Sequence, residues 1–194
     1  MSTVMALEDL PHRHRITVEE YHRMAEVGLL APDARVELIE GEIIDMAPIG
    51  NPHRATVMLL DDLLHRAVGK RGIVLCQSSI RLGPHSEPEP DLAVLRARAD
   101  YYRSAAPTAA DTLLVIEVSD TTWRYDRHTK IPLYARHGIP EAWLIDVSRS
   151  MIHVFRKPSA EGFTEEACAE SPGLTTVPGL AGVTVDLSTL FPAG

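Results

Sequence analysis

The segment Leu113 to Ser119, with the sequence Leu-Leu-Val-Ile-Glu-Val-Ser, constrains the fold more than any other part of the chain. It is almost continuously apolar and rich in β-branched residues, which favours a strand buried on both faces. Such a strand is typical of the centre of an α/β sheet, because other layers must cover both of its faces. The sequence therefore predicts an α/β fold in which Glu117 stands near the end of a central strand.

Length and composition are those of an ordinary globular protein. The chain has 194 residues, of which 45% are hydrophobic and 24% are charged. We expect one domain over residues 17–194, preceded by a flexible N-terminal arm at residues 1–16 that lacks apolar periodicity. No run approaches the roughly 18 apolar residues of a membrane span, and the start lacks the apolar middle of a signal peptide. Two isolated cysteines with no paired spacing agree with a reducing compartment, so we expect a cytoplasmic protein without membrane contact.

Turn and cap signals divide the N-terminal half into two helices and a hairpin. Thr17 and Glu20 have the spacing of a capping box, which predicts a helix from about Thr17 to Val27. Apolar residues on both sides of Glu40-Gly41 predict a hairpin that carries Glu37 and Glu42 on its strands. Asn51, read as the N-cap, and the proline after it begin a second helical stripe that runs to Gly69.

The C-terminal half reads as strands around one helix. A proline-rich loop at residues 83–90 separates two strands and forbids a continuous helix. The expected elements are strands at Ile73–Leu82 and Asp91–Leu95, a helix at Asp126–His137, a hairpin of Ala142–Val147 with Met151–Phe155, short strands up to Val185, and one helical turn at Asp186–Phe191.

Two acids stand at strand ends where they can meet. Asp91 follows Pro90 at the start of one strand, and Glu117 comes 26 residues later on the central strand. Side chains alternate along a strand, so Glu117 and Ser119 share a face. Two carboxylates on neighbouring strands can hold Mg²⁺ or Mn²⁺, which prefer oxygen ligands. The alternative is that both acids only satisfy loop amides at strand ends.

A cationic helix follows the second acid. Between Trp123 and His137 there are four permanently basic residues, Arg124, Arg127, Lys130 and Arg136, and one acid, Asp126. The whole chain carries a net charge of −8, which argues against a general nucleic-acid coat. Lys130 and Tyr134 are one turn apart, so this helix could carry a lysine back over the Glu117 end of the strand. The alternative is a surface pair of Asp126 with Lys130, worth about 0–1 kcal/mol.

Several ordered motifs resemble the Uma-two family of candidate restriction endonucleases, which belongs to the PD-(D/E)XK nuclease superfamily. The resemblance covers roughly Val18 to Phe191. Its motifs are Arg35-Val-Glu-Leu-Ile-Glu-Gly-Glu-Ile43, Pro52-His53, Glu89-Pro-Asp91, Leu114-Val-Ile-Glu-Val-Ser119, Asp126 with Lys130 and Tyr134, and Gly138-Ile-Pro-Glu-Ala-Trp-Leu-Ile-Asp146.

This resemblance implies a restriction-endonuclease-like mixed β-sheet flanked by helices, with an N-terminal helix and β-hairpin, and a Mg²⁺- or Mn²⁺-dependent endonuclease acting on DNA. Asp91 and Glu117 match the metal ligands. Ser119 stands where the superfamily has its lysine, so the lysine's role passes to Lys130. Glu37 matches an additional acid from the N-terminal element, with Glu40 and Glu42 as rivals.

The remaining candidates are substrate-binding residues: His53, Arg124, Arg127, Ser119 and Tyr134. His53 near a helix start could contact a phosphate through the N-terminal amides, or be simply solvated there. A homodimer is expected, because cutting both strands of a duplex uses two sites. The alternatives are an inactive nuclease-like module that binds DNA or a protein partner, and a metallohydrolase of small molecules.

Overall fold

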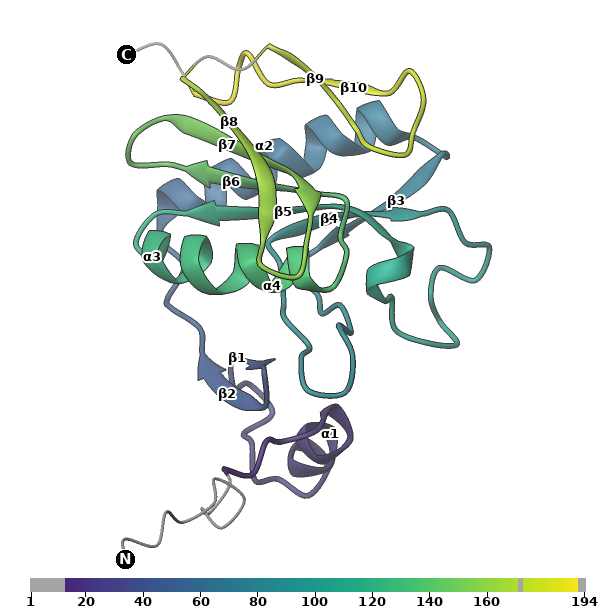
Figure 1. Ribbon diagram of the computed structural model, residues 1–194, viewed down its shortest axis with the longest axis vertical. Coiled ribbons are helices and arrows are strands. Elements are labelled where there is room, and N and C mark those ends of the chain that lie inside the picture. The colour runs from purple at the N-terminus through teal and green to yellow at the C-terminus, as the bar shows by residue number, and fades with distance from the viewer. Residues whose placement is uncertain (1–12, 171–172, 192–194) are drawn as a thin grey trace, which may run out of the picture.

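A six-stranded sheet forms the centre of the computed structural model, which describes residues 13–170 and 173–191 (Figure 1). The strand order is β3-β4-β5-β6-β7-β8, and only β5 and β6 are parallel. The sheet is therefore mixed, as predicted. The strands are β3 (Gly72–Cys76), β4 (Leu92–Arg96), β5 (Thr112–Ser119), β6 (Glu141–Asp146), β7 (Met151–Pro158) and β8 (Phe163–Ala169).

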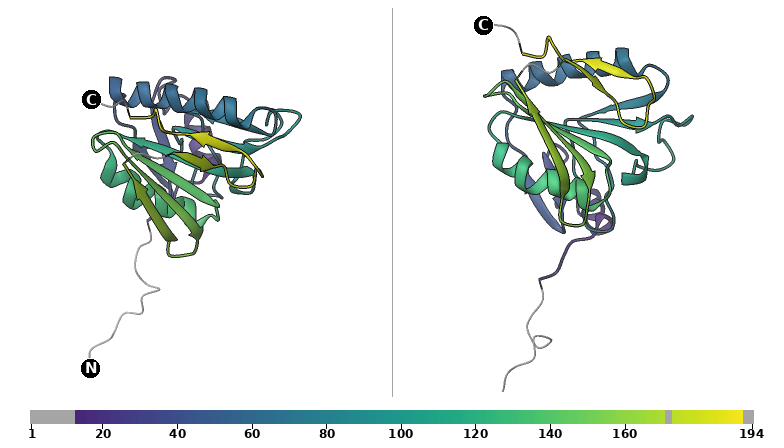
Figure 2. Two further views of the ribbon diagram at one scale, coloured as in Figure 1. Left: turned by 90° about the horizontal axis from the view of Figure 1, so that it is seen from above. Right: turned by 45° about the horizontal axis from the view of Figure 1, so that its top comes forward.

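Helices cover both faces of the sheet, and each face has its own hydrophobic core (Figure 2). Helix α2 (Asn51–Val68) packs on one face, where its Leu60 and Leu64 share a core with Ile116. On the other face lies one helical run made of α3 (Trp123–Tyr125), η3 (Asp126–Lys130) and α4 (Ile131–Arg136). Every residue of β5 is buried, as expected of a strand between two layers.

The helical run has one wider turn, at Asp126–Lys130. Segment η3 is a π-helix in which the Ile131 amide donates to the Asp126 carbonyl, five residues back. Pro132 follows and has no N–H to donate to the carbonyl of His128, and its ring would crowd that carbonyl in an α-helix. The proline therefore accounts for the wider turn, and π segments of this kind are frequent at functional sites.

The N-terminal helix and hairpin lie together on one side of the sheet (Figure 1). Helix α1 (Val18–Glu26) has the predicted capping box of Thr17 with Glu20. Strands β1 (Val36–Ile39) and β2 (Glu42–Asp45) pair antiparallel across Glu40 and Gly41, which have φ of 49° and 82° and so form the tight turn that a two-residue hairpin needs. Most of the predicted N-terminal arm, residues 1–12, lies outside the described residues.

Four sequence predictions of element boundaries were wrong. The strand expected at Ile73–Leu82 ends at Cys76, because Gln77 has a left-handed φ of 42°. Gly50, not Asn51, is the N-cap of α2. The helix expected from Asp126 begins at Trp123. The C-terminal helical turn is a plain turn that follows β9 (Leu174–Thr176) and β10 (Thr184–Asp186), where the Ser188 amide donates to the Asp186 carboxylate.

Among the described residues, no helix is both long enough and apolar enough to cross a membrane.

Candidate active site

The register of the central sheet brings Asp91 and Glu117 together. Leu92 of β4 is opposite Ile116 of β5 in an antiparallel pair. One step further along the same register, Asp91 therefore faces Glu117, and side chains opposed in this way are direct neighbours. A hydrogen bond of 2.9 Å from the Val118 amide to Asp91 Oδ2 fixes this alignment.

Glu117 is a buried carboxyl with two donors on one oxygen. Its Oε1 accepts from the Tyr134 hydroxyl and lies 2.8 Å from the ammonium of Lys130. Only 2% of the residue is exposed. Burial raises the pKa of Glu117 to about 8, against the lowering by the Lys130 charge. This carboxyl therefore takes up a proton at a higher pH than an exposed glutamate does, and a bound cation would oppose that uptake.

Lys130 points into the sheet, not toward solvent. Its Nζ also donates to the Glu89 carbonyl at 3.0 Å and lies 3.4 Å from Glu37 Oε2. Burial alone would lower the pKa of Lys130, but the carboxylates of Glu117 and Glu37 raise it well above its usual value. The amine is therefore a fixed positive charge, held by one hydrogen bond and by contacts with two carboxyl groups.

Glu37, on hairpin strand β1, connects the hairpin to Lys130 and to two neighbouring segments. Its Oε1 accepts from the Tyr125 hydroxyl at 3.0 Å, and its Oε2 accepts from the Glu89 amide at 3.0 Å. Both oxygens are thus occupied within the chain. The rival acids face away from the site: Glu40 pairs with Arg136 at the surface, and Glu42 is exposed near Arg13.

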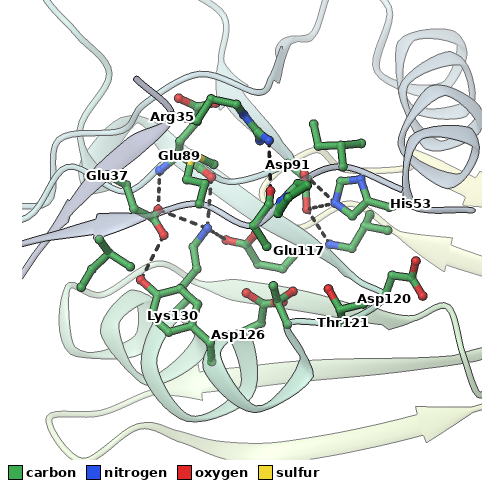
Figure 3. Close-up of a pocket in the computed structure, with 18 of the residues that line it drawn as sticks. Arg35, Glu37, His53, Glu89, Asp91, Glu117, Asp120, Thr121, Asp126 and Lys130 are labelled. Carbon is green, nitrogen blue, oxygen red and sulfur yellow. Dashed lines mark hydrogen bonds and ion pairs between the residues drawn. The ribbon is translucent and has the colours of Figure 1, made fainter. Parts of the chain in front are cut away.

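His53 holds the other acid. Its Nε2 lies 3.1 Å from both oxygens of Asp91, while its Nδ1 is buried with no partner among the described residues. The hydrogen bond to Asp91 raises the pKa of His53 above its ordinary value, although burial opposes the shift. The ring sits in the first turn of α2, so the helix N-terminus orients Asp91 through it (Figure 3).

One cavity of about 360 Å³ connects these groups (Figure 3). Seven carboxylic side chains line it, against the two permanent cations Arg35 and Lys130. This excess of acid favours a bound cation. The carboxylic residues are Glu37, Asp45, Glu89, Asp91, Glu117, Asp120 and Asp126.

Asp126 is a further acid of the site. It is 5% exposed and lines the cavity, which excludes the alternative of a surface pair with Lys130. Burial raises the pKa of Asp126, and the Thr122 hydroxyl donates to its Oδ2 at 2.5 Å. Arg35, Glu89 and Asp120 were missed as lining residues. Glu89 could have been found, since it precedes Asp91 by two residues.

Four predicted substrate contacts do not line the cavity. Ser119 and Tyr134 are fully buried, so they have no surface to offer a substrate. Arg124 is exposed elsewhere on the helix. Arg127 pairs with Glu166 of β8 and lies over the ring of Phe155, because it projects from a different side of the helix.

The residues present fit a small, hard divalent ion. Asp91 and Glu117 offer oxygen donors only, and Mg²⁺ is commonly held by one or two carboxylates with water and substrate phosphate completing the shell. Within residues 13–170 and 173–191, no group of three or more His, Cys, Asp or Glu side chains converges as a ready-made metal cage. A site with two carboxylates is consistent with both observations.

The fold and this cleft define a nuclease-like protein with a restriction-endonuclease type of sheet. The chain belongs to the Uma2 family, described as "Putative restriction endonuclease", which matches residues 18–188. A solved structure from Anabaena variabilis, titled as a putative nuclease belonging to DUF820, is similar in fold, with a TM-score of 0.67 and 22% sequence identity. The match covers 91% of this chain and 97% of that one. None of the curated protein sequences matches this chain.

Proposed function

We propose that the protein is a metal-dependent endonuclease that hydrolyses phosphodiester bonds of DNA. The observation that carries the proposal is the convergence of Asp91, Glu117 and the Lys130 ammonium on one cavity. Membership of the Uma2 family supports a nuclease over other hydrolases. A binding module that held no metal would have no physical reason to bury a carboxyl beside a second acid on the neighbouring strand.

Each group of the chain has a role in this proposal. Asp91 and Glu117 would hold Mg²⁺ or Mn²⁺, which when bound supplies neutralisation of phosphoryl charge and activation of water. Lys130 holds Glu117 in place and adds positive charge beside the reacting phosphate. Glu37 positions Lys130, and His53 positions Asp91, through the contacts described above.

Cleavage assays with conservative variants test the proposal. Purified protein is incubated with plasmid, single-stranded DNA and RNA in Mg²⁺ or Mn²⁺. Asp91→Asn keeps an oxygen for the Val118 amide but loses the charge, so we expect cleavage to fall at least about 100-fold. Asp62→Asn, at an exposed acid of α2 paired with Arg66, is the matched control and should cut normally. Equal cleavage by all three proteins would mean a contaminating nuclease and would remove the assigned site.

The second candidate function is a nuclease-like module that binds DNA or a protein partner without cutting. One observation favours it: the Lys130 ammonium already contacts two acids and the Glu89 carbonyl of the chain itself. Metal binding separates the two candidates. If the protein is the enzyme, calorimetric titration with Mn²⁺ gives a saturable heat of binding, and Asp91→Asn abolishes it. If the protein is a module that does not cut, the titration gives no such heat.

A further inference from the structure

One wall of the cavity has a different character from the rest. Seven consecutive residues, 44–50, line it along the stretch that leads from β2 to α2. Residues 46–50 form neither helix nor strand. Arg35 fixes this wall at two points: its carbonyl accepts from the Met46 amide at 2.9 Å, and its Nη1 donates to the Ala47 carbonyl at 3.0 Å.

Most side chains of this wall are apolar; the exception is Asp45, whose carboxylate belongs to the acidic set that lines the cavity. Met46 and Ile49 are half-buried, and Ala47 and Pro48 are exposed. A nucleotide has the matching division, with a charged phosphate joined to a flat, uncharged base. Apolar side chains such as Ile, Met and Pro contact base faces in other nucleic-acid complexes. The wall therefore has the chemistry of a base subsite beside the phosphate site.

Size and charge select an unpaired nucleotide over a duplex. The volume of about 360 Å³ lies at the small end of ligand cavities, roughly 300–1,000 Å³. A duplex presents a negative charge about every 1.7 Å of its axis, whereas the cavity offers two permanent cations against seven acids. A base must also leave its stack to reach such a wall, which costs least when it is already unpaired.

We propose that the apolar side chains of residues 44 and 46–49 receive the base of an unpaired nucleotide whose phosphate lies at Asp91 and Glu117. The inference rests on the proposed function for the position of the phosphate. It assigns the substrate class: single-stranded DNA, or strands unpaired at a fork, a loop or a frayed end.

Binding is measured apart from cleavage. A short fluorescein-labelled single strand and the same strand in a duplex are titrated by fluorescence anisotropy in Ca²⁺, and a gel afterwards confirms that the strand is intact. We expect the single strand to bind at least about tenfold tighter, because a duplex must first unpair a base to reach the wall. Equal or tighter binding of the duplex overturns the proposal, as does the absence of single-strand binding.

Two methionines supply a matched pair of variants. Met46→Asp puts a charge into the apolar wall and should weaken single-strand binding about tenfold. Met58→Asp makes the same change on the exposed side of α2, where the side chain lies outside the cavity, and should leave binding unchanged. Ile49→Asp repeats the test should Met46→Asp melt early. Normal binding by a folded wall variant contradicts the base subsite.

The same experiments separate this inference from the proposed function. A protein that binds single strands through Met46 but cuts nothing keeps the base subsite and loses the nuclease. A protein that cuts plasmid duplex as fast as single strands, and binds both equally, keeps the nuclease and loses the subsite.

Discussion

Lys130 and Arg127 lie three residues apart on one helical run, yet Lys130 contacts buried acids and Arg127 contacts an acid that is open to water. Lys130 is 4% exposed and contacts the carboxylates of Glu117 and Glu37 beneath the helix. Arg127 is 28% exposed and contacts Glu166 on β8, at the far edge of the sheet. The side of the helix on which a cation lies, not its nearness in the sequence, therefore decides whether it reaches Glu117 and Glu37.

The largest expected effect is the loss of DNA cleavage when the buried Lys130 is replaced. Lys130→Gln removes the charge but keeps hydrogen-bond donors toward Glu117, so we expect the rate of DNA cleavage to fall about 100-fold. Arg127→Gln makes the same change on the other side and should cut within about twofold of the natural protein. Initial rates on labelled DNA measure both. If the two variants lose activity equally, the helix has no functional side.

Tyr134→Phe tests how much the hydrogen bond to the buried Glu117 contributes to the stability of the fold. The variant removes the hydroxyl that donates to Glu117 Oε1 and leaves the Lys130 contact to that oxygen. We expect the free energy of unfolding to fall by about 1–3 kcal/mol, because a buried acceptor loses a partner. Denaturant unfolding near pH 7 measures it. Tyr102→Phe is the control, since that hydroxyl donates to the Arg96 carbonyl near the surface.

Sequence periodicity could predict the sheet and the two acids, but not how the cation is used. The apolar run of β5 placed Glu117 near a strand end, where it could meet Asp91 on a neighbouring strand, but the register that pairs them comes from the structure. The reach of Lys130 was expected from helix spacing and its family resemblance. Its acceptors were not, since Glu37 and the Glu89 carbonyl come from segments that meet only through tertiary packing.

The same limit explains the misplaced residues. A surface pair of Asp126 with Lys130 stayed open as an alternative because an i, i+4 pair is usually solvated, whereas the wide turn before Pro132 buries both residues. The arginines were assigned to the substrate from charge alone. Only β8, far along the chain, supplies the Glu166 that draws Arg127 away.

Metal binding should depend on pH because the proposed metal ligand Glu117 is a buried acid with a raised pKa. The raised pKa of Glu117, about 8, means that a proton competes with the cation below that pH. In the metal-free protein, the stability that this raised pKa contributes is present below about pH 4.5 and lost as pH rises through about 8. Stabilisation by Mn²⁺ should therefore grow from about pH 6 to about pH 8.5, by at most about tenfold in affinity per pH unit.

Melting temperatures with and without Mn²⁺ across this pH range check the sign. Glu166→Gln, on the Arg127 side, should reproduce the pH dependence of the natural protein because that acid lies outside the cavity. An effect of Mn²⁺ that stays constant from pH 6 to pH 8.5 would contradict a proton on Glu117.

The smallest expected effect is the stability of the Arg127 side. Arg127→Ala removes an ion pair with Glu166 at 2.6 Å and the guanidinium that lies over the Phe155 ring. Both partners are open to water, so the loss of unfolding free energy should be about 0–1 kcal/mol. His153 also contacts Glu166, at 3.0 Å, and leaves that acid with a partner. A measured loss as large as that of Tyr134→Phe would show that the outer pair is as strongly coupled as the buried one, and the contrast between the two sides would then rest on catalysis alone.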